Sequence, residues 1–262
     1  MPGHTSPETL VVQAGAATVC VGVRGEGPPV VMHPSLGRGG SDFDDLAGRL
    51  AAAGFRAAAM DPRGVGRSRG PADGLTLHDL ASDIAAVVGA LGDDPAHLIG
   101  HAYGNRVVRC AAADHPELVR SVTLLAAGGL VPPEPEAARA LARCFELDRP
   151  LAERLADVRS AFFAGESDPA VWTDGWWPET ARLERAATQA TPLEDWWTAG
   201  SAPVLVVQGL EDRVAPPANG RDIKERLGDR AELVEVSPAG HALLPEQPEA
   251  IAEAVVRFLR RQ

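Results

Sequence analysis

The chain has 262 residues, of which 45% are hydrophobic and 23% are charged, as in an ordinary globular protein. This length suits one sizeable domain with room for an insertion. The 36 acidic and 25 basic residues give a formal net charge of −11, which argues against nucleic acid as a partner because phosphate binding needs a basic surface.

The three cysteines, Cys20, Cys110 and Cys144, are scattered and form no CxxC pair, so we expect no zinc or iron–sulfur site. An odd and sparse cysteine count suits a reducing compartment. The N-terminus lacks the basic start and apolar core of a signal peptide, and no apolar run approaches the ~20 residues of a membrane span. The sequence therefore predicts a soluble, cytoplasmic protein with no membrane partner. We also expect a monomer or homodimer that takes a small-molecule substrate.

Short apolar runs alternate with helical patterns along the first half of the chain. Thr9–Val12 and Ala17–Val23 flank a turn and predict a hairpin. Continuous apolar runs predict buried strands, and apolar residues at helical spacing predict the helices between them. In chain order these are a strand at Pro29–His33, a helix at Phe43–Ala53, a strand at Phe55–Met60, a helix at Leu77–Leu91, a strand at Ala96–Ile99, a helix to His115 and a strand at Val119–Ala126.

The pattern changes after Gly129, where three prolines interrupt the chain and a helical stretch without a clear strand follows. It contains all five tryptophans. Strands at Pro203–Gln208 and Ala231–Val236 and helices near Pro217–Leu227 and Pro248–Arg260 then resume the alternation. Alternating strands and helices favour a mostly parallel sheet covered on both faces. We expect residues 1–131 and 199–262 to form this core and residues 132–198 to form an inserted helical cap.

The stretch LIGHAYGNRVVR, Leu98–Arg109, passes from a predicted strand to a predicted helix through a glycine-flanked turn. Gly100 and Gly104 permit the close backbone approach that such a turn needs. The spacing is that of the Gly-x-Ser-x-Gly nucleophile elbow, but Ala102 stands at the serine position. A methyl group cannot attack a carbonyl carbon.

Two further residues follow the last two strands. Asp212 lies in QGLEDRVAPP and His241 lies in SPAGHALLPEQPE. Ligands of open parallel sheets bind at the carboxyl ends of the strands, where both residues are expected. A carboxylate that fixes the imidazole tautomer allows the histidine to move protons. Glu211 is the alternative acid.

The loop HPSLGRGG follows the strand Pro29–His33. Its backbone N–H groups at Ser35 or Leu36, together with that of Tyr103, are candidates for an oxyanion hole. Pro34 cannot contribute because it has no N–H. Ser35 and Arg38 are also in reach of a substrate.

The motifs MHPSLGRGG, MDPRGVGRS, LIGHAYGNRVV, VQGLEDRVAPP and AGHALLPEQPE, in this order, resemble the capped α/β-hydrolase superfamily. The resemblance spans nearly the whole chain outside the cap. It implies an α/β fold with a mostly parallel eight-stranded sheet flanked by helices and an inserted helical cap. It also implies a hydrolase with Ala102 at the nucleophile position, Asp212 and His241 as its acid–base pair, and no cofactor or metal.

Ala102 is either an engineered replacement of serine or the native residue, and three functions remain open. In the first, the chain is an enzyme that acts on a small, partly apolar ester, lactone or thioester. In the second, His241 and Asp212 carry out non-covalent lyase, isomerase or cyclase chemistry. In the third, the chain is a non-catalytic small-molecule receptor. The cap is expected to roof the pocket and to favour an apolar substrate. The predicted substrate contacts are His101, Arg38, Phe163, Trp172, Trp176 and Trp177.

Overall fold

The computed structural model describes residues 6–262, and its centre is a single eight-stranded sheet. The strand order is β1-β2-β4-β3-β5-β6-β7-β8. β2 runs antiparallel to β1 and β4, and every other neighbouring pair is parallel, which confirms the predicted mostly parallel sheet. The strands are β1 (Glu8–Ala14), β2 (Ala17–Arg24), β3 (Pro29–His33), β4 (Arg56–Met60), β5 (Ala96–His101), β6 (Val119–Leu125), β7 (Val204–Gly209) and β8 (Ala231–Val236).

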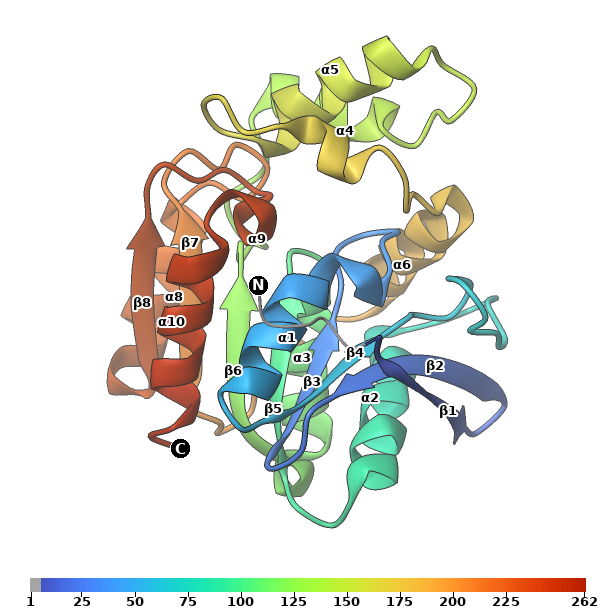
Figure 1. The fold of residues 1–262 in the computed structure, drawn as a ribbon, viewed down its shortest axis with the longest axis vertical. Helices are drawn as coiled ribbons and strands as arrows, with labels where there is room; N and C mark the ends of the chain where they lie inside the picture. The colour runs from blue at the N-terminus through green and yellow to red at the C-terminus, as the bar shows by residue number, and fades with distance from the viewer. Residues whose placement is uncertain (1–5) are drawn as a thin grey trace.

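Helices cover both faces of the sheet (Figure 1). α2 (Leu77–Leu91), α3 (Gly104–Asp114) and α8 (Ala218–Leu227) share one core cluster, and α1 (Asp44–Ala52) and α10 (Pro248–Leu259) share the other. All residues of β3, β5 and β7 are buried, which is why these strands read as continuous apolar runs. No helix within residues 6–262 is both long and apolar enough to cross a bilayer.

The chain between β6 and β7 is helical and lies over the carboxyl ends of the strands, with α4 and α5 at the top of Figure 1. Its elements are α4 (Pro135–Arg143), α5 (Leu151–Phe162), a 3₁₀ turn (Pro169–Trp172), α6 (Pro178–Ala190) and α7 (Leu193–Trp196). α4 and α6 both begin with proline, whose missing N–H is unpaired in a first turn anyway.

The two ends of this insertion pack differently. α4, α5 and the 3₁₀ turn form a separate apolar cluster that includes Phe162 and Trp172. Trp196 and Trp197 instead join the main core, where their rings lie 4.6 and 4.7 Å from the fully buried guanidinium of Arg109 on α3. The end of the predicted cap is thus packed as part of the core layer, and the boundary at residue 198 remains a prediction.

Candidate active site

The turn between β5 and α3 places Ala102 in the left-handed region, with φ +50°. Its N–H donates to the carbonyl of Leu125 on β6 at 2.9 Å, and its own carbonyl accepts from Asn105 N–H at 3.2 Å. These bonds tie the strained residue to the neighbouring strand and to the first turn of the helix. Ala102 therefore occupies a rigid position between sheet and helix.

Gly100 and Gly104 must be glycine because there is no room for a Cβ atom at either position. A Cβ at Gly100 would lie 2.5 Å from the carbonyl carbon of Gly104, and one at Gly104 would lie 2.2 Å from the carbonyl oxygen of His33. Both contacts are with backbone that cannot move aside. The GHAYG pattern is thus explained by close packing of β5, α3 and the end of β3.

Substituting Ala102→Gly is expected to raise the free energy of unfolding by about 0.5–1 kcal/mol. Left-handed backbone costs a non-glycine residue roughly 1–2 kcal/mol, and the greater entropy of glycine in the unfolded chain offsets part of the gain. Urea unfolding measures the difference. The matched control, Ala86→Gly in the middle of α2, should lower stability by about 1 kcal/mol, and a loss in both variants would contradict strain at residue 102.

Asp212 and His241 form a buried pair at the ends of β7 and β8. His241 Nδ1 lies 2.9 Å from Oδ2 and 3.1 Å from Oδ1 of Asp212. The same carboxylate accepts from the N–H groups of Val214 and Ala215 at 2.9 and 2.7 Å. These donors hold Asp212 in place, and Asp212 as an acceptor requires the proton on Nδ1 of His241. Nε2 is left as the basic nitrogen.

The alternative acid, Glu211, points elsewhere. Its carboxylate accepts from Ser237 Oγ at 2.8 Å and from Ala239 N–H at 2.9 Å, and so it fixes the loop that carries His241. Asp212 is thus the carboxylate that contacts the imidazole.

The structure places His101, a predicted substrate contact, behind His241. The residue is fully buried as the last residue of β5, and its Nε2 bonds the backbone carbonyl of His241 at 2.9 Å. Burial, with a smaller contribution from the neighbouring His241, lowers the pKa of His101 to about 3, so the ring is neutral. It lies outside the cavity lining and holds the backbone of His241 from behind.

A cavity of about 250 Å³ brings most of the predicted residues together. Ala102 and His241 lie in its wall, and Ser35, Leu36 and Tyr103 line it from the β3 loop and the elbow. Among the hydrogen bonds of residues 6–262, none engages the N–H groups of these last three residues, whereas Gly37 N–H donates to Glu184 Oε2 at 2.7 Å. The same cavity thus contains the basic Nε2 of His241 and backbone N–H groups that have no hydrogen-bond acceptor among the described residues.

The cap contributes an aromatic wall around Arg38. Trp172 and Trp176 line the cavity, and their rings lie 4.8 and 4.6 Å from the Arg38 guanidinium, which also lines it. Phe162 completes this wall, 5.7 Å from the ring of His241.

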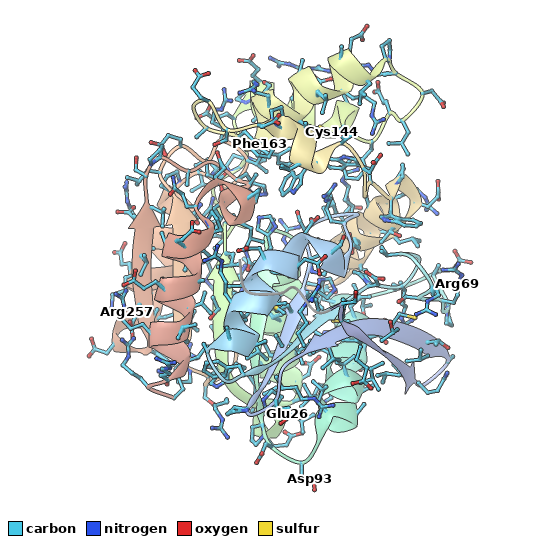
Figure 2. The ribbon with its side chains drawn as sticks, in the orientation of Figure 1. Glu26, Arg69, Asp93, Cys144, Phe163 and Arg257 are labelled. Carbon is cyan, nitrogen blue, oxygen red and sulfur yellow. The ribbon has the colours of Figure 1, made fainter. Side chains whose placement is uncertain are left out.

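Phe163 and Trp177, two further predicted substrate contacts, lie outside the cavity lining. Phe163 is buried against Trp172 with its ring 5.5 Å away, and its place on the cap is marked in Figure 2. Trp177 is 37% exposed and is absent from the residues that line the cavity. Each is the chain neighbour of a residue that does line the cavity, and consecutive side chains point in different directions.

Sequence reasoning missed two arginines in the lining, Arg106 of α3 and Arg185 of α6. Arg106 stands in the first turn of α3, directly after the elbow. That place in the sequence was the available signal for Arg106. Arg185 comes from the cap, and no local pattern marks the helix face that meets the core.

One group of possible metal ligands occurs in the described part of the chain, away from the cavity. His78 Nδ1, Cys110 Sγ and Asp114 Oδ2 lie within 4.8 Å of one another. His78 Nδ1 lies 2.8 Å from Asp114 Oδ2, and burial raises the pKa of the Cys110 thiol above its usual range. The arrangement therefore acts as a link between α2 and α3 with a protonated thiol.

Comparisons with known proteins agree with this architecture. Residues 28–150 match the family model described as "alpha/beta hydrolase fold", and residues 175–262 match the model described as "TAP-like protein". Together with the elbow, the Asp–His pair and the sheet order, these matches define the class. The chain belongs to the α/β-hydrolase superfamily.

Relatives within it carry several activities in their names. The 2-(acetamidomethylene)succinate hydrolase of Mesorhizobium japonicum is 29% identical, over 95% of this chain and 94% of its own. The non-heme chloroperoxidase of Streptomyces lividans is also 29% identical, over 90% and 92%.

Solved structures show the same fold. The crystal structure of E-2-(acetamidomethylene)succinate hydrolase superimposes with a TM-score of 0.79 and 26% identity, covering 97% of this chain and 99% of its own. An esterase from Exiguobacterium antarcticum superimposes with a TM-score of 0.81 at 22% identity, covering 97% and 100%.

Proposed function

We propose that this protein hydrolyses a small, partly apolar carbonyl compound (an ester, lactone or thioester), with His241 activating water directly. The observation that carries the proposal is the buried Asp212–His241 pair, which leaves Nε2 of His241 basic. His241 shares its cavity with Ala102, whose methyl group cannot act as a nucleophile. The names of the relatives as hydrolases and esterases support the reaction class. Because Ala102 cannot form an ester bond, no acyl-enzyme lies on this route.

The proton moves along one path. Nε2 of His241 takes a proton from water as the hydroxide oxygen attacks the carbonyl carbon, and Asp212 stabilises the imidazolium that forms. The imidazolium then returns the proton to the departing alkoxide or thiolate. The N–H groups of Tyr103 and of Ser35 or Leu36 stabilise the negative charge on the carbonyl oxygen.

The cavity limits the substrate. A volume of about 250 Å³ is below the common range of ~300–1,000 Å³ for ligand pockets, which favours a compact molecule. The aromatic wall of Phe162, Trp172 and Trp176 favours an apolar segment next to the reacting carbonyl.

The test compares the native chain with Ala102→Ser on p-nitrophenyl acetate, with and without a serine-directed phosphonate. We expect slow hydrolysis by the native chain that the phosphonate does not inhibit. We expect Ala102→Ser to react with the phosphonate and to show an acyl-enzyme by mass spectrometry, because the base and the backbone donors are already in place.

Ala126→Ser is the matched control. Ala126 lines the same cavity with φ +52°, but it is not the elbow residue, so its serine should form no adduct. The proposal fails if the native chain hydrolyses no ester, lactone or thioester of this size. If Ala102→Ser forms no adduct, the assigned oxyanion donors are misplaced.

A further inference from the structure

The charge of the cavity wall is opposite to the charge of the protein. The chain carries a net charge of −11, yet the described residues that line the cavity include three arginines and one histidine and no aspartate or glutamate. Such a local excess of positive charge attracts anions in spite of the charge of the whole molecule.

Arg38 already has a carboxylate partner. Its Nε and Nη2 donate to Asp42 at 2.8 and 2.6 Å, and its Nη1 donates to the carbonyl of Asp174 at 2.8 Å. The guanidinium is thus neutralised and held between two tryptophans. Arg38 therefore forms part of the cavity wall, but its charge is already paired with Asp42.

Arg106 has no such partner within residues 6–262. Its Nη1 reaches only Thr188 Oγ1, at 3.4 Å, and its guanidinium lies 5.9 Å from the ring of Trp196. The residue stands in the first turn of α3, which contains no acidic residue to balance the positive end of the helix. Burial lowers the pKa of Arg106, because a desolvated cation is costly without an anion beside it.

Arg185 approaches the same cavity from the cap. Its guanidinium lies 5.2 Å from the ring of Phe145 and makes no ion pair within 4.0 Å among the described residues. The adjacent Glu184 forms no ion pair with it, because the Glu184 carboxyl turns inward and accepts from the Gly37 N–H at 2.7 Å. Core and cap therefore each present one unpaired cation to the same space.

We infer that Arg106 and Arg185 bind a carboxylate of the substrate, so that the natural substrate is an anionic carbonyl compound. A carboxylate two to four carbons from the reacting carbonyl keeps the whole molecule small enough for a cavity of about 250 Å³. The inference rests on the proposed function for the reacting end, whereas the carboxylate site can be tested by binding alone.

The experiment compares monomethyl glutarate with dimethyl glutarate at pH 7.5, using the native chain, Arg106→Gln, Arg185→Gln and Arg182→Gln. Arg182 is an exposed arginine of α6 outside the cavity and serves as the control. We expect the native chain and Arg182→Gln to prefer the monoanion by at least tenfold in kcat/KM. Each of the other two variants should reduce that preference at least tenfold, mainly through KM, because charge-assisted hydrogen bonds are lost.

Binding of glutarate, measured by titration calorimetry, separates the two claims. Hydrolysis of both esters without preference overturns the carboxylate site and leaves the proposed function standing. Glutarate binding that Arg106→Gln or Arg185→Gln weakens at least tenfold, in the absence of ester hydrolysis, supports the carboxylate site and contradicts the proposed function. Absence of both hydrolysis and glutarate binding in the native chain overturns both.

Discussion

Replacing His241 with alanine is expected to lower kcat/KM for ester hydrolysis by about 10²–10⁴-fold, the usual contribution of a general base. The imidazole is the only basic side chain in the described cavity lining other than the three arginines, which stay protonated and cannot serve as the base at neutral pH. Steady-state kinetics with p-nitrophenyl acetate measure the effect, and circular dichroism checks that the variant is folded.

Asp212→Asn should lower kcat/KM for ester hydrolysis by a similar factor, but for a different reason. The amide keeps one oxygen for the N–H groups of Val214 and Ala215, but its NH₂ group cannot accept from Nδ1 of His241. The ring then carries its proton on Nε2 and has no basic nitrogen facing the cavity. His115→Ala, outside the cavity, is the control, and full activity in Asp212→Asn would contradict a general-base role for the pair.

Acid is expected to unfold the protein steeply, because three buried histidines are neutral in the folded state. Burial lowers the pKa of His33 and His97 to about 4 and that of His101 to about 3, from an ordinary value of 6.5. The unfolded chain therefore binds more protons as the pH falls below 6.5. The stability is fully present above that pH and is lost at up to about 1.4 kcal/mol per pH unit for each histidine, until the folded pKa is reached.

His97→Gln isolates one of these contributions. His97 Nδ1 lies 2.7 Å from Ser121 Oγ, and glutamine keeps a polar group there but cannot titrate. Urea unfolding between pH 6 and 4.5 should give a free energy of unfolding whose slope against pH is lower by roughly 1 kcal/mol per unit than in the native chain. Between pH 7.5 and 8.5 the difference in free energy of unfolding between the two proteins should be constant. Equal slopes against pH in acid would contradict a lowered pKa for His97.

The sheet and the elbow could be predicted because their signals are local. Fully buried strands read as apolar runs, and the glycines around Ala102 follow from backbone contacts within a short turn. Asp212 and His241 each follow a strand of a parallel sheet, so their convergence at one edge could be expected from topology.

The side chains around the substrate could not be predicted in the same way. Phe162 and Phe163 are neighbours of the same residue type, and only the packing of the cap on the core decides which one faces the cavity. His101 has the polarity of a ligand contact, but its place at the end of a buried strand turns it to the back of His241. Arg185 reaches the cavity only through the tertiary position of α6.

Arg38 also joins the loop after β3 to the helical insertion. Its guanidinium is anchored to the core loop by Asp42, while Trp172, Trp176 and the Asp174 carbonyl hold it from the cap. Lifting this side of the cap would separate three contacts at once and expose two indole rings to water. The single guanidinium of Arg38 therefore fastens the helical insertion to the loop after β3.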